Sequence, residues 1–398
     1  MKKNTIMFLM LIPFFLPSYF IISENELILE IFKILKVISV IYILLLYITK
    51  WKKIKISKGL IAIAVFQLYQ ILISIILKAN YDDLFSVTIN IICACLIINF
   101  FIQKNTKKLL YTLMIIYEIL IYMNLLFMLI FPNGFMLSDG AYGEPVFLLG
   151  IDNTHITTIL PGIFISLLYS YRYNNKITIR SILLLVCSTT TIVIRWSVTS
   201  LIAIVMIWIY LLCKRIFEGL KFFNFLNYII TDIILFFLVV IIKIQQNIAP
   251  IIYFLFKKEA NFTGRVEVWD YSINQILKSP IYGYGNRVLG KVYFDGKNRI
   301  INHSHNMFFN MLFQGGIIGF GIFSYIIYQL WEVLRVNKCK IEKLISYVLF
   351  VYFVISLVES YQMFAFFLIC TIAFNINYII KEGNEENNNV NKYNNTYI

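Results

Sequence analysis

Residues 59–77 read GLIAIAVFQLYQILISIIL, a run of 19 residues without a single charged side chain. A helix of about 20 apolar residues is long enough to cross the hydrocarbon core of a bilayer. Similar runs recur along the 398-residue chain, which is 60% hydrophobic and only 14% charged. This composition excludes a soluble globular protein, and the runs are continuous rather than alternating, which argues against a membrane β-barrel. The sequence therefore predicts an all-α polytopic membrane protein.

We expect about twelve transmembrane helices. Their predicted ranges are 5–22, 28–49, 59–77, 84–102, 108–130, 154–171, 178–194, 197–213, 226–243, 306–330, 344–359 and 361–380. Lys and Arg gather in alternate connections, a bias typical of cytoplasmic loops, so both termini are predicted to be cytoplasmic. This pattern predicts a multi-pass membrane protein. The Asn-rich stretch 381–398 is predicted to be a disordered cytoplasmic tail.

The net charge of +14 would suggest a nucleic-acid partner in a soluble protein. Here most of the basic residues mark the inner ends of predicted helices, so we expect the bilayer as the partner and no nucleic acid. The six cysteines are scattered through helices and inner loops, which predicts neither a disulfide framework nor a Cys-based metal or redox site.

One long polar stretch interrupts the hydrophobic blocks between the ninth and tenth predicted helices. It divides the chain into 1–243 with helices one to nine, 244–305 as a large extracytoplasmic loop, and 306–380 with helices ten to twelve. From Lys243 to Asn306 there are nine basic and four acidic residues. A basic loop on the outer face predicts an anionic ligand.

All three histidines map to this outer side. His303 and His305 directly precede the tenth helix, where an imidazole can act as a general base near neutral pH. His155 lies at an outer helix end, where it binds either substrate or a backbone carbonyl. Thr263 is a plausible cap for a helix running to Lys278, which places Arg265 beside free backbone N–H groups that favour anions.

Several alternatives remain open on sequence grounds. Arg287 and Lys291 are either substrate-binding residues or plain surface charges. Arg195, at the outer end of helix seven, is either a second anion ligand or a charge at the membrane interface. A zinc site would need Asp152 and His155 to join the His303/His305 pair. Glu118 and Asp232 lie within predicted helices and suit either a proton relay or structural ion pairs.

An ordered set of motifs surrounds the polar loop. It comprises Thr263-Gly264-Arg265, Trp269, Ser279-Pro280-Ile281-Tyr282-Gly283-Tyr284-Gly285, His305-Asn306 and Gly315-Gly316-Ile317-Ile318-Gly319. Together they resemble the signature of the O-antigen ligase and polymerase superfamily, which includes the repeat-unit polymerases of bacterial capsule and O-antigen. The motifs cover about 260–320, and the multi-span layout agrees over the rest of the chain.

The resemblance implies a GT-C-like membrane glycosyltransferase that acts at the outer leaflet of the bacterial cytoplasmic membrane. Such an enzyme uses glycans carried on undecaprenyl diphosphate and needs neither a cofactor nor a metal. Arg265 matches the family's loop arginine and His305 its histidine, with His303 as an additional neighbour. Arg195 is a shifted candidate, because Arg195-Trp196-Ser197 departs from the family's Ser-Arg order. The flippase and the chain-length regulator of the same pathway are the partners that the resemblance implies.

Among these functions we favour polymerisation of undecaprenyl-diphosphate-linked oligosaccharide repeat units. The motifs fit equally a ligase that transfers the glycan to a lipid or wall acceptor. A flippase or other transporter is the alternative from another class, but the two halves of the chain show no internal repeat. A non-catalytic assembly partner would have few spans and a long coiled coil, and neither is present.

Overall fold

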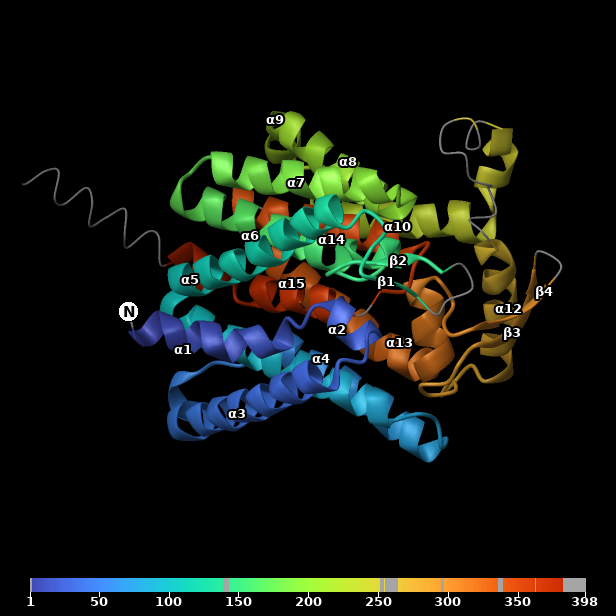
Figure 1. Ribbon diagram of the computed structural model, residues 1–398, viewed down its shortest axis with the longest axis horizontal. Helices are drawn as coiled ribbons and strands as arrows, with labels where there is room; N and C mark the ends of the chain where they lie inside the picture. The colour runs from blue at the N-terminus through green and yellow to red at the C-terminus, as the bar shows by residue number, and fades with distance from the viewer. Residues whose placement is uncertain are drawn as a thin grey trace, which may run out of the picture.

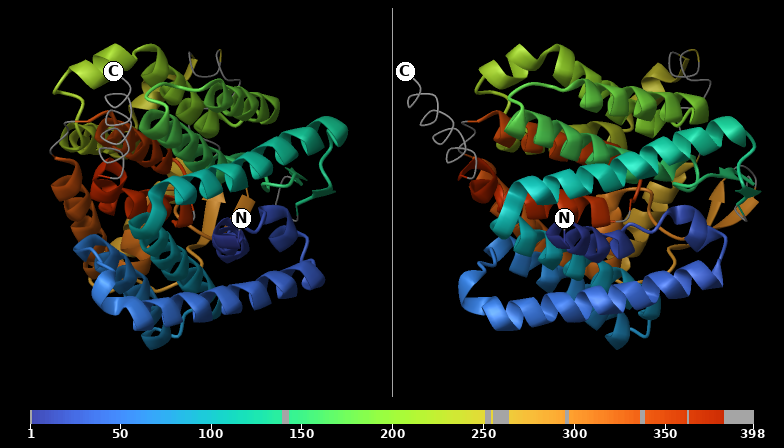
Figure 2. Two further views of the ribbon diagram at one scale, coloured as in Figure 1. Left: turned by 90° about the vertical axis from the view of Figure 1, so that its left-hand side faces the viewer. Right: turned by 60° about the vertical axis from the view of Figure 1, so that its left-hand side comes forward.

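The computed structural model describes residues 2–138, 143–250, 254, 264–294, 297–335, 339–361 and 363–381. Most helices run roughly along one axis and form a bundle (Figure 1). Helix α12 (Arg265–Lys278) lies across one end of this bundle, which we call the α12 end. The first residues of α1 and the last described residues both lie at the opposite end (Figures 1 and 2). The bundle thus has one end that carries the motif-rich loop and one that carries both termini.

The N-terminal elements are α1 (Lys2–Leu11), the 3₁₀ turn η1 (Ile12–Phe14), α2 (Ser18–Ile22), α3 (Glu26–Lys50), η2 (Trp51–Lys53) and α4 (Lys58–Ile76). The predicted span 5–22 is thus not one helix. Pro13 lies in η1 and Pro17 is the N-cap of α2. Proline has no backbone N–H and its ring clashes with the preceding helical turn, so the helix breaks here.

Helix α5 (Asp82–Ile130) covers two predicted spans, 84–102 and 108–130. Asn105 within it has φ −164° and ψ 88°, which is extended rather than helical. Its side-chain oxygen accepts from the backbone N–H of Lys108 at 2.9 Å, as an N-cap does. Figure 2 shows the chain reversing direction there, so the two halves are separate helices joined at Asn105.

The middle of the chain has the 3₁₀ turn η3 (Asp152–Thr154) and helices α6 (Ile156–Tyr173), α7 (Ile179–Arg195), α8 (Val198–Leu212), α9 (Lys214–Gly219) and α10 (Phe225–Phe236). A π-helical turn, η4 (Phe237–Ile241), and the 3₁₀ turn η5 (Ile244–Ile248) follow α10. Helices α6, α7, α8 and α10 match the predicted spans to within a few residues, except that the ninth span ends in the π turn. Helix α9 lies between two predicted spans and was not predicted.

The C-terminal helices are α13 (Met307–Leu334), α14 (Lys340–Ser356) and α15 (Phe364–Phe374). The predicted spans 344–359 and 361–380 are therefore misplaced at their shared boundary. Residues 357–361 and 363 lie outside both helices, and Glu359 is in this connection. Of the predicted tail, residues 382–398 lie outside the described residues.

The structure also contains two small antiparallel hairpins, which the all-α expectation missed. Strands β1 (Met136–Leu137) and β2 (Pro145–Val146) pair, as do β3 (Gly290–Phe294) and β4 (Lys297–Ile301). The second hairpin has a sequence signal, because Asp-Gly between runs of β-forming residues is typical of a tight turn. Asp295 and Gly296 occupy that place in the sequence.

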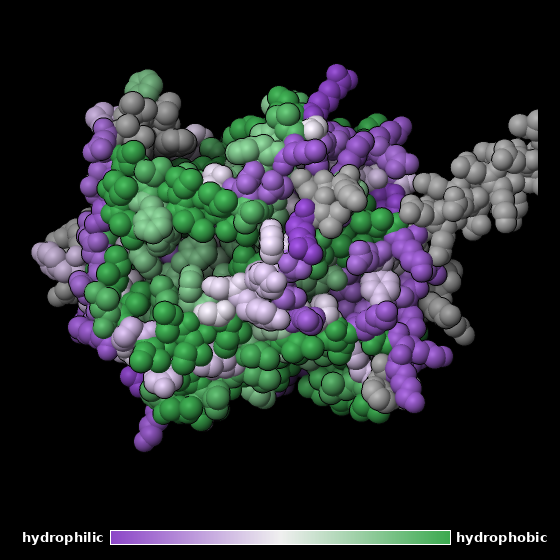
Figure 3. Space-filling view, turned by 180° about the vertical axis from the view of Figure 1, so that it is seen from behind, coloured by the Kyte–Doolittle hydropathy of each residue, from purple (hydrophilic) through white to green (hydrophobic). Residues whose placement is uncertain are grey.

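Packing agrees with a protein solvated by lipid. Within the described residues four helices are long and apolar enough to cross a membrane: α3, α4, α5 and α13. Many large hydrophobic side chains are exposed, and Figure 3 shows them in a broad zone between more hydrophilic surfaces at the two ends. Exposed apolar surface of this extent is costly in water and favourable in a bilayer. The protein is mostly helical and consistent with a polytopic membrane protein.

A turn of the loop is inserted into the hydrogen bonding of α13. In a regular helix the carbonyls of Phe313 and Gln314 would accept from Ile317 and Ile318. Here they accept from the backbone N–H groups of Tyr284 (2.8 Å) and Gly285 (2.9 Å), while Ile317 and Ile318 donate to Pro280 (2.8 Å) and Ile281 (3.4 Å).

Two glycines make this insertion possible. Gly316 has φ 59° and ψ −163°, and a Cβ there would lie 2.2 Å from the carbonyl oxygen of Ile281. A Cβ on Gly283, at φ 70°, would lie 2.5 Å from the carbonyl oxygen of Phe313. Only glycine fits these conformations and close approaches. Gly315 and Gly319 instead pack against α4, whereas Gly321 faces open space.

Candidate active site

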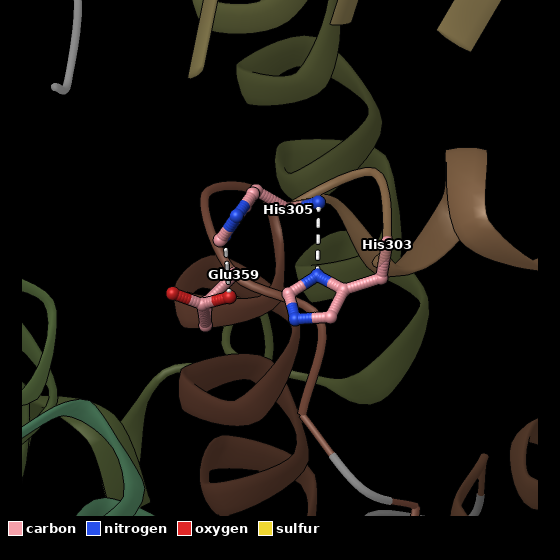
Figure 4. Close-up of side chains that lie close together, drawn as sticks. All are labelled: His303, His305 and Glu359. Carbon is pink, nitrogen blue, oxygen red and sulfur yellow. Dashed lines mark hydrogen bonds and ion pairs between the residues drawn. The ribbon is translucent and has the colours of Figure 1, made fainter. Parts of the chain in front are cut away.

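Three residues that are far apart in the sequence meet at the α12 end. Glu359 Oε2 accepts from Nη2 of Arg265 at 2.6 Å, and Glu359 Oε1 lies 2.9 Å from Nδ1 of His305. Figure 4 shows the carboxylate beneath the His305 ring, with the His303 ring at its side. The centroids of the two imidazole rings are 4.4 Å apart. We call Arg265, His303, His305 and Glu359 the Glu359 cluster.

The start of α12 positions Arg265. Its N-cap is Gly264 at φ 85°, in the left-handed region that glycine tolerates. Thr263, the predicted cap, lies outside the described residues. Val266 and Trp269 face the bundle and pack with Val240 and Phe309. The opposite side of the helix packs through Val268 against Val292 of the β3–β4 hairpin. Fixed between bundle and hairpin, α12 presents its first residue to Glu359.

His305 is held in an unusual conformation. Its φ of 47° lies in the left-handed region, which costs a non-glycine residue of order 1 kcal/mol and must be offset by surrounding contacts. The indole N–H of fully buried Trp269 donates to the His305 carbonyl at 3.3 Å. The next residue, Asn306, caps α13 through Phe309 N–H and donates to the carbonyl of Leu357 at 2.7 Å. These bonds tie His305 to the connection that carries Glu359.

The cluster keeps the carboxylate charged. Burial would raise the pKa of Glu359, but the hydrogen bond with His305 and the positive charge of Arg265 outweigh it and lower the pKa to about 2. The ionised carboxylate can only accept a hydrogen bond, so Nδ1 of His305 carries the hydrogen and Nε2 is left free to accept a proton. The His305 side chain is 30% exposed, against 9% for Glu359, so the imidazole is the accessible member of this pair.

His303 has a different environment. Burial first, and then the neighbouring His305, lower the pKa of His303 to about 4, so its imidazole is neutral at physiological pH. Its Nδ1 accepts from the backbone N–H of His305 across a long 3.4 Å contact. The geometry therefore makes His303 a neighbour that supports the main chain of His305.

The cluster also contains side chains that could bind a metal ion. Ligand atoms of His303, His305 and Glu359 lie within 4.8 Å of one another, a donor set that suits zinc. However, Arg265 already occupies Glu359 Oε2, and its positive charge repels a second cation at that place. Asp152 and His155, the predicted third and fourth ligands, bond elsewhere.

His155 and Arg195 belong to a separate network. His155 is fully buried and its Nε2 lies 3.1 Å from the carbonyl oxygen of Gly150, which is the backbone contact considered from the sequence. Arg195 pairs with Asp152, with Nε 2.6 Å from Oδ1, and its guanidinium lies over the Phe147 ring. Within the described residues no hydrogen bond or ion pair joins this network to the Glu359 cluster.

Arg287 and Lys291 also lie apart from the cluster's hydrogen bonds. Arg287 donates to the carbonyl of Leu77 and so caps the end of α4. Lys291 is exposed on β3, opposite Ile300 of β4. Neither contacts Arg265 or His305 through any bond among the described residues.

The predicted intramembrane acids differ from each other. Glu118 forms a bidentate pair with Arg180, with contacts of 2.7 and 2.5 Å, which is the structural ion pair considered above. Asp232 is buried in α10 without a hydrogen bond to Oδ1. The two acids are not bonded to each other in the described part of the chain, which gives no support to a proton relay between them.

Sequence reasoning missed Glu359 as a site residue. The predicted spans 344–359 and 361–380 meet at the outer side, which puts Glu359 on the same side as Arg265 and His305. That shared side was the available signal. The contact itself depends on how α13 and α14 pack, which the sequence pattern does not specify.

Comparison with protein families finds a match. Residues 154–324 match a family model described as O-antigen ligase, a segment that includes Arg265 and His305. Searches of curated proteins and of solved structures found no match. Residues 154–324 are therefore similar to the O-antigen ligase domain, and this match is to the O-antigen ligase and polymerase superfamily that the motifs resemble.

Proposed function

We propose that this protein polymerises undecaprenyl-diphosphate-linked oligosaccharide repeat units into capsular polysaccharide or O-antigen at the outer face of the cytoplasmic membrane. The observation that carries the proposal is the shared carboxylate of Glu359, which holds a guanidinium and an imidazole side by side. Both partners, Arg265 and His305, lie in the segment that matches the family. A cation for a diphosphate and a base for a hydroxyl are the two groups that glycosyl transfer from a lipid diphosphate needs.

Arg265 binds the diphosphate of the donor. A guanidinium has five N–H groups, and Nη2 bonds to Glu359, which leaves others for phosphate oxygens. Its position as the first residue of α12 adds the free backbone N–H groups and the positive end of the helix dipole. These groups stabilise the negative charge that builds on the diphosphate as it leaves.

His305 accepts the proton of the acceptor sugar. Nδ1 is engaged by Glu359, so the proton moves to Nε2 as the hydroxyl oxygen bonds to the anomeric carbon. The bond between that carbon and the diphosphate oxygen breaks, and undecaprenyl diphosphate departs with the electron pair. Glu359 stabilises the imidazolium that forms, as a carboxylate does in other base–carboxylate pairs.

The first test uses purified protein in liposomes with undecaprenyl-diphosphate-linked repeat units and no other acceptor. A ladder of products from the wild type, reduced at least about 100-fold in Arg265→Ala and in His305→Ala, is the expected result. Lys278→Ala is the matched control, because it removes an exposed cation from the other end of α12. Full ladders from both site variants would overturn the assignment.

The same reaction separates the alternatives. Transfer that occurs only after a lipid or wall acceptor is added would identify a ligase. Movement of the lipid-linked unit between leaflets, without a new glycosidic bond, would identify a flippase and overturn the proposed enzyme.

A further inference from the structure

The hydroxyl of Tyr361 is buried beside the Glu359 cluster and has no hydrogen-bond partner among the residues that the structure describes. Tyr361 is 6% exposed and follows Glu359 by two residues in the connection between α14 and α15. Its ring packs in the main hydrophobic core, but its oxygen is buried without a bond. An unpaired buried hydroxyl costs about 1–3 kcal/mol, so its retention in a protein calls for an explanation.

The nearby carboxylate does not supply the missing partner. Glu359 Oε1 accepts from His305 Nδ1 and from the backbone N–H of Ser360 at 3.1 Å, and Oε2 accepts from Arg265. The charges of Glu359 and Arg265 both act on Tyr361, which places the phenol within their electrostatic reach. Burial, followed by the Glu359 charge, raises the pKa of Tyr361 well above its usual value. The phenol therefore remains a neutral O–H donor at any physiological pH.

We infer that the Tyr361 hydroxyl donates a hydrogen bond to an oxygen of the donor's diphosphate, as a second binding group next to Arg265. A donor without an acceptor, close to a guanidinium proposed to grip an anion, suits an anionic oxygen better than a neutral one. This inference rests on the proposed function and extends it, because it assigns to the diphosphate a neutral donor from outside the segment 154–324 that matches the family.

Tyr361→Phe isolates the hydroxyl, because it keeps the ring in the core. The probe is undecaprenyl diphosphate without sugar, whose Kd is measured for detergent-solubilised protein. We expect Kd to rise about tenfold to hundredfold, the range for losing a hydrogen bond to a charged group. We also expect kcat/KM for polymerisation to fall. Tm should be unchanged or higher, since the variant removes an unpaired polar atom.

Tyr210→Phe is the matched control. Tyr210, in α8, is also fully buried with an unpaired hydroxyl, and the same replacement there should leave Kd and kcat/KM at wild-type values. If Tyr361→Phe binds the probe and turns over like the wild type, the inference is wrong. It is also wrong if Tm falls markedly, because the hydroxyl would then serve the fold.

The same measurements distinguish two further outcomes. An unchanged Kd with a raised KM for the acceptor would assign the hydroxyl to the acceptor sugar and overturn the diphosphate contact. If the wild type neither binds the probe nor polymerises, the proposed function fails and this inference fails with it. A wild type that does both, with an inactive Arg265→Ala, leaves Tyr361→Phe as a test of the inference alone.

Discussion

Glu359 Oε1 lies 2.9 Å from Nδ1 of His305, although 54 residues separate the two along the chain. The neighbouring residue reinforces this contact, since the side-chain amide of Asn306 donates to the carbonyl of Leu357. Two adjacent residues before α13 are thus bonded to the connection after α14. The imidazole of His305 and the carboxylate of Glu359 are therefore fixed relative to each other by their own bond and by the neighbouring bond from the Asn306 side chain.

Glu359→Gln should lower polymerisation by about 100-fold or more. Glutamine keeps the size of the side chain but removes the charge that pairs with Arg265 and that fixes the tautomer of His305. Product ladders from purified protein measure the effect. Glu118→Gln is the control, because it neutralises a carboxylate that pairs with Arg180 instead. Equal losses in both variants would point to general destabilisation and contradict a specific role for Glu359.

The stability of the protein should fall as the pH is lowered from about 6.5 to about 4, in part through His303. Its pKa is lowered from 6.5 to about 4 in the folded protein, so in this window the unfolded state binds a proton that the folded state does not. Stability then rises with pH across the window. His303→Gln should flatten this slope, measured as Tm in detergent at several pH values.

The titration of Glu359 contributes little to the pH dependence of Tm that is attributed to His303. Its stabilising contribution is complete above about 4.5 and is lost as the pH falls toward about 2, below the His303 window. A slope between pH 6.5 and 4 that is identical in His303→Gln and the wild type would contradict the assignment.

Gly316→Ala should destabilise the protein by about 3 kcal/mol or more. Its φ of 59° suits glycine alone, and a Cβ would collide with the carbonyl of Ile281 in the inserted turn. Gly321→Ala, in the same helix, meets open space and should be neutral or slightly stabilising, because alanine favours helix over glycine. Tm of the two purified variants tests this pair, and a similar Tm in both would show that the inserted turn tolerates a side chain.

Removing metal ions should leave polymerisation unchanged, whereas added zinc should inhibit it. EDTA has no effect because Arg265 supplies the positive charge at Glu359 Oε2. Zinc in excess competes for His303, His305 and Glu359, which converge within 4.8 Å, and so blocks the base. Loss of activity in EDTA that zinc or magnesium restores would mean that a metal takes part in the reaction.

Much of the fold follows from the pattern of hydrophobic residues. The apolar runs of α4, α6, α7, α8 and α13 predict these helices to within a few residues, because a helix in lipid must satisfy its own backbone bonds. The breaks were harder to place. Pro13 and Pro17 divided a predicted helix, and Glu359 lay in a connection rather than in a span.

The candidate site was only partly predictable. Arg265 and His305 were predicted as site residues from their motifs and from their position on the outer side of the membrane. In the structure both bond to the carboxylate of Glu359. Arg195 and Arg287 carried the same charge in the sequence, yet one pairs with Asp152 and the other caps α4. Charge and side of the membrane do not distinguish these cases, because the outcome depends on which helix ends are neighbours.

The turn inserted into α13 has a consequence for how this protein can diversify. Four main-chain bonds fasten residues 280–285 to α13, and Asn306 anchors the other end of the loop. The β3–β4 hairpin lies between these two anchors. Main-chain bonds do not depend on side-chain identity, so these anchors tolerate changes in the hairpin's sequence. The side of the hairpin that packs against α12 through Val292 is constrained, because α12 carries Arg265. The exposed side of the hairpin, which includes Lys291, is therefore where this loop can vary while the Glu359 cluster keeps its geometry.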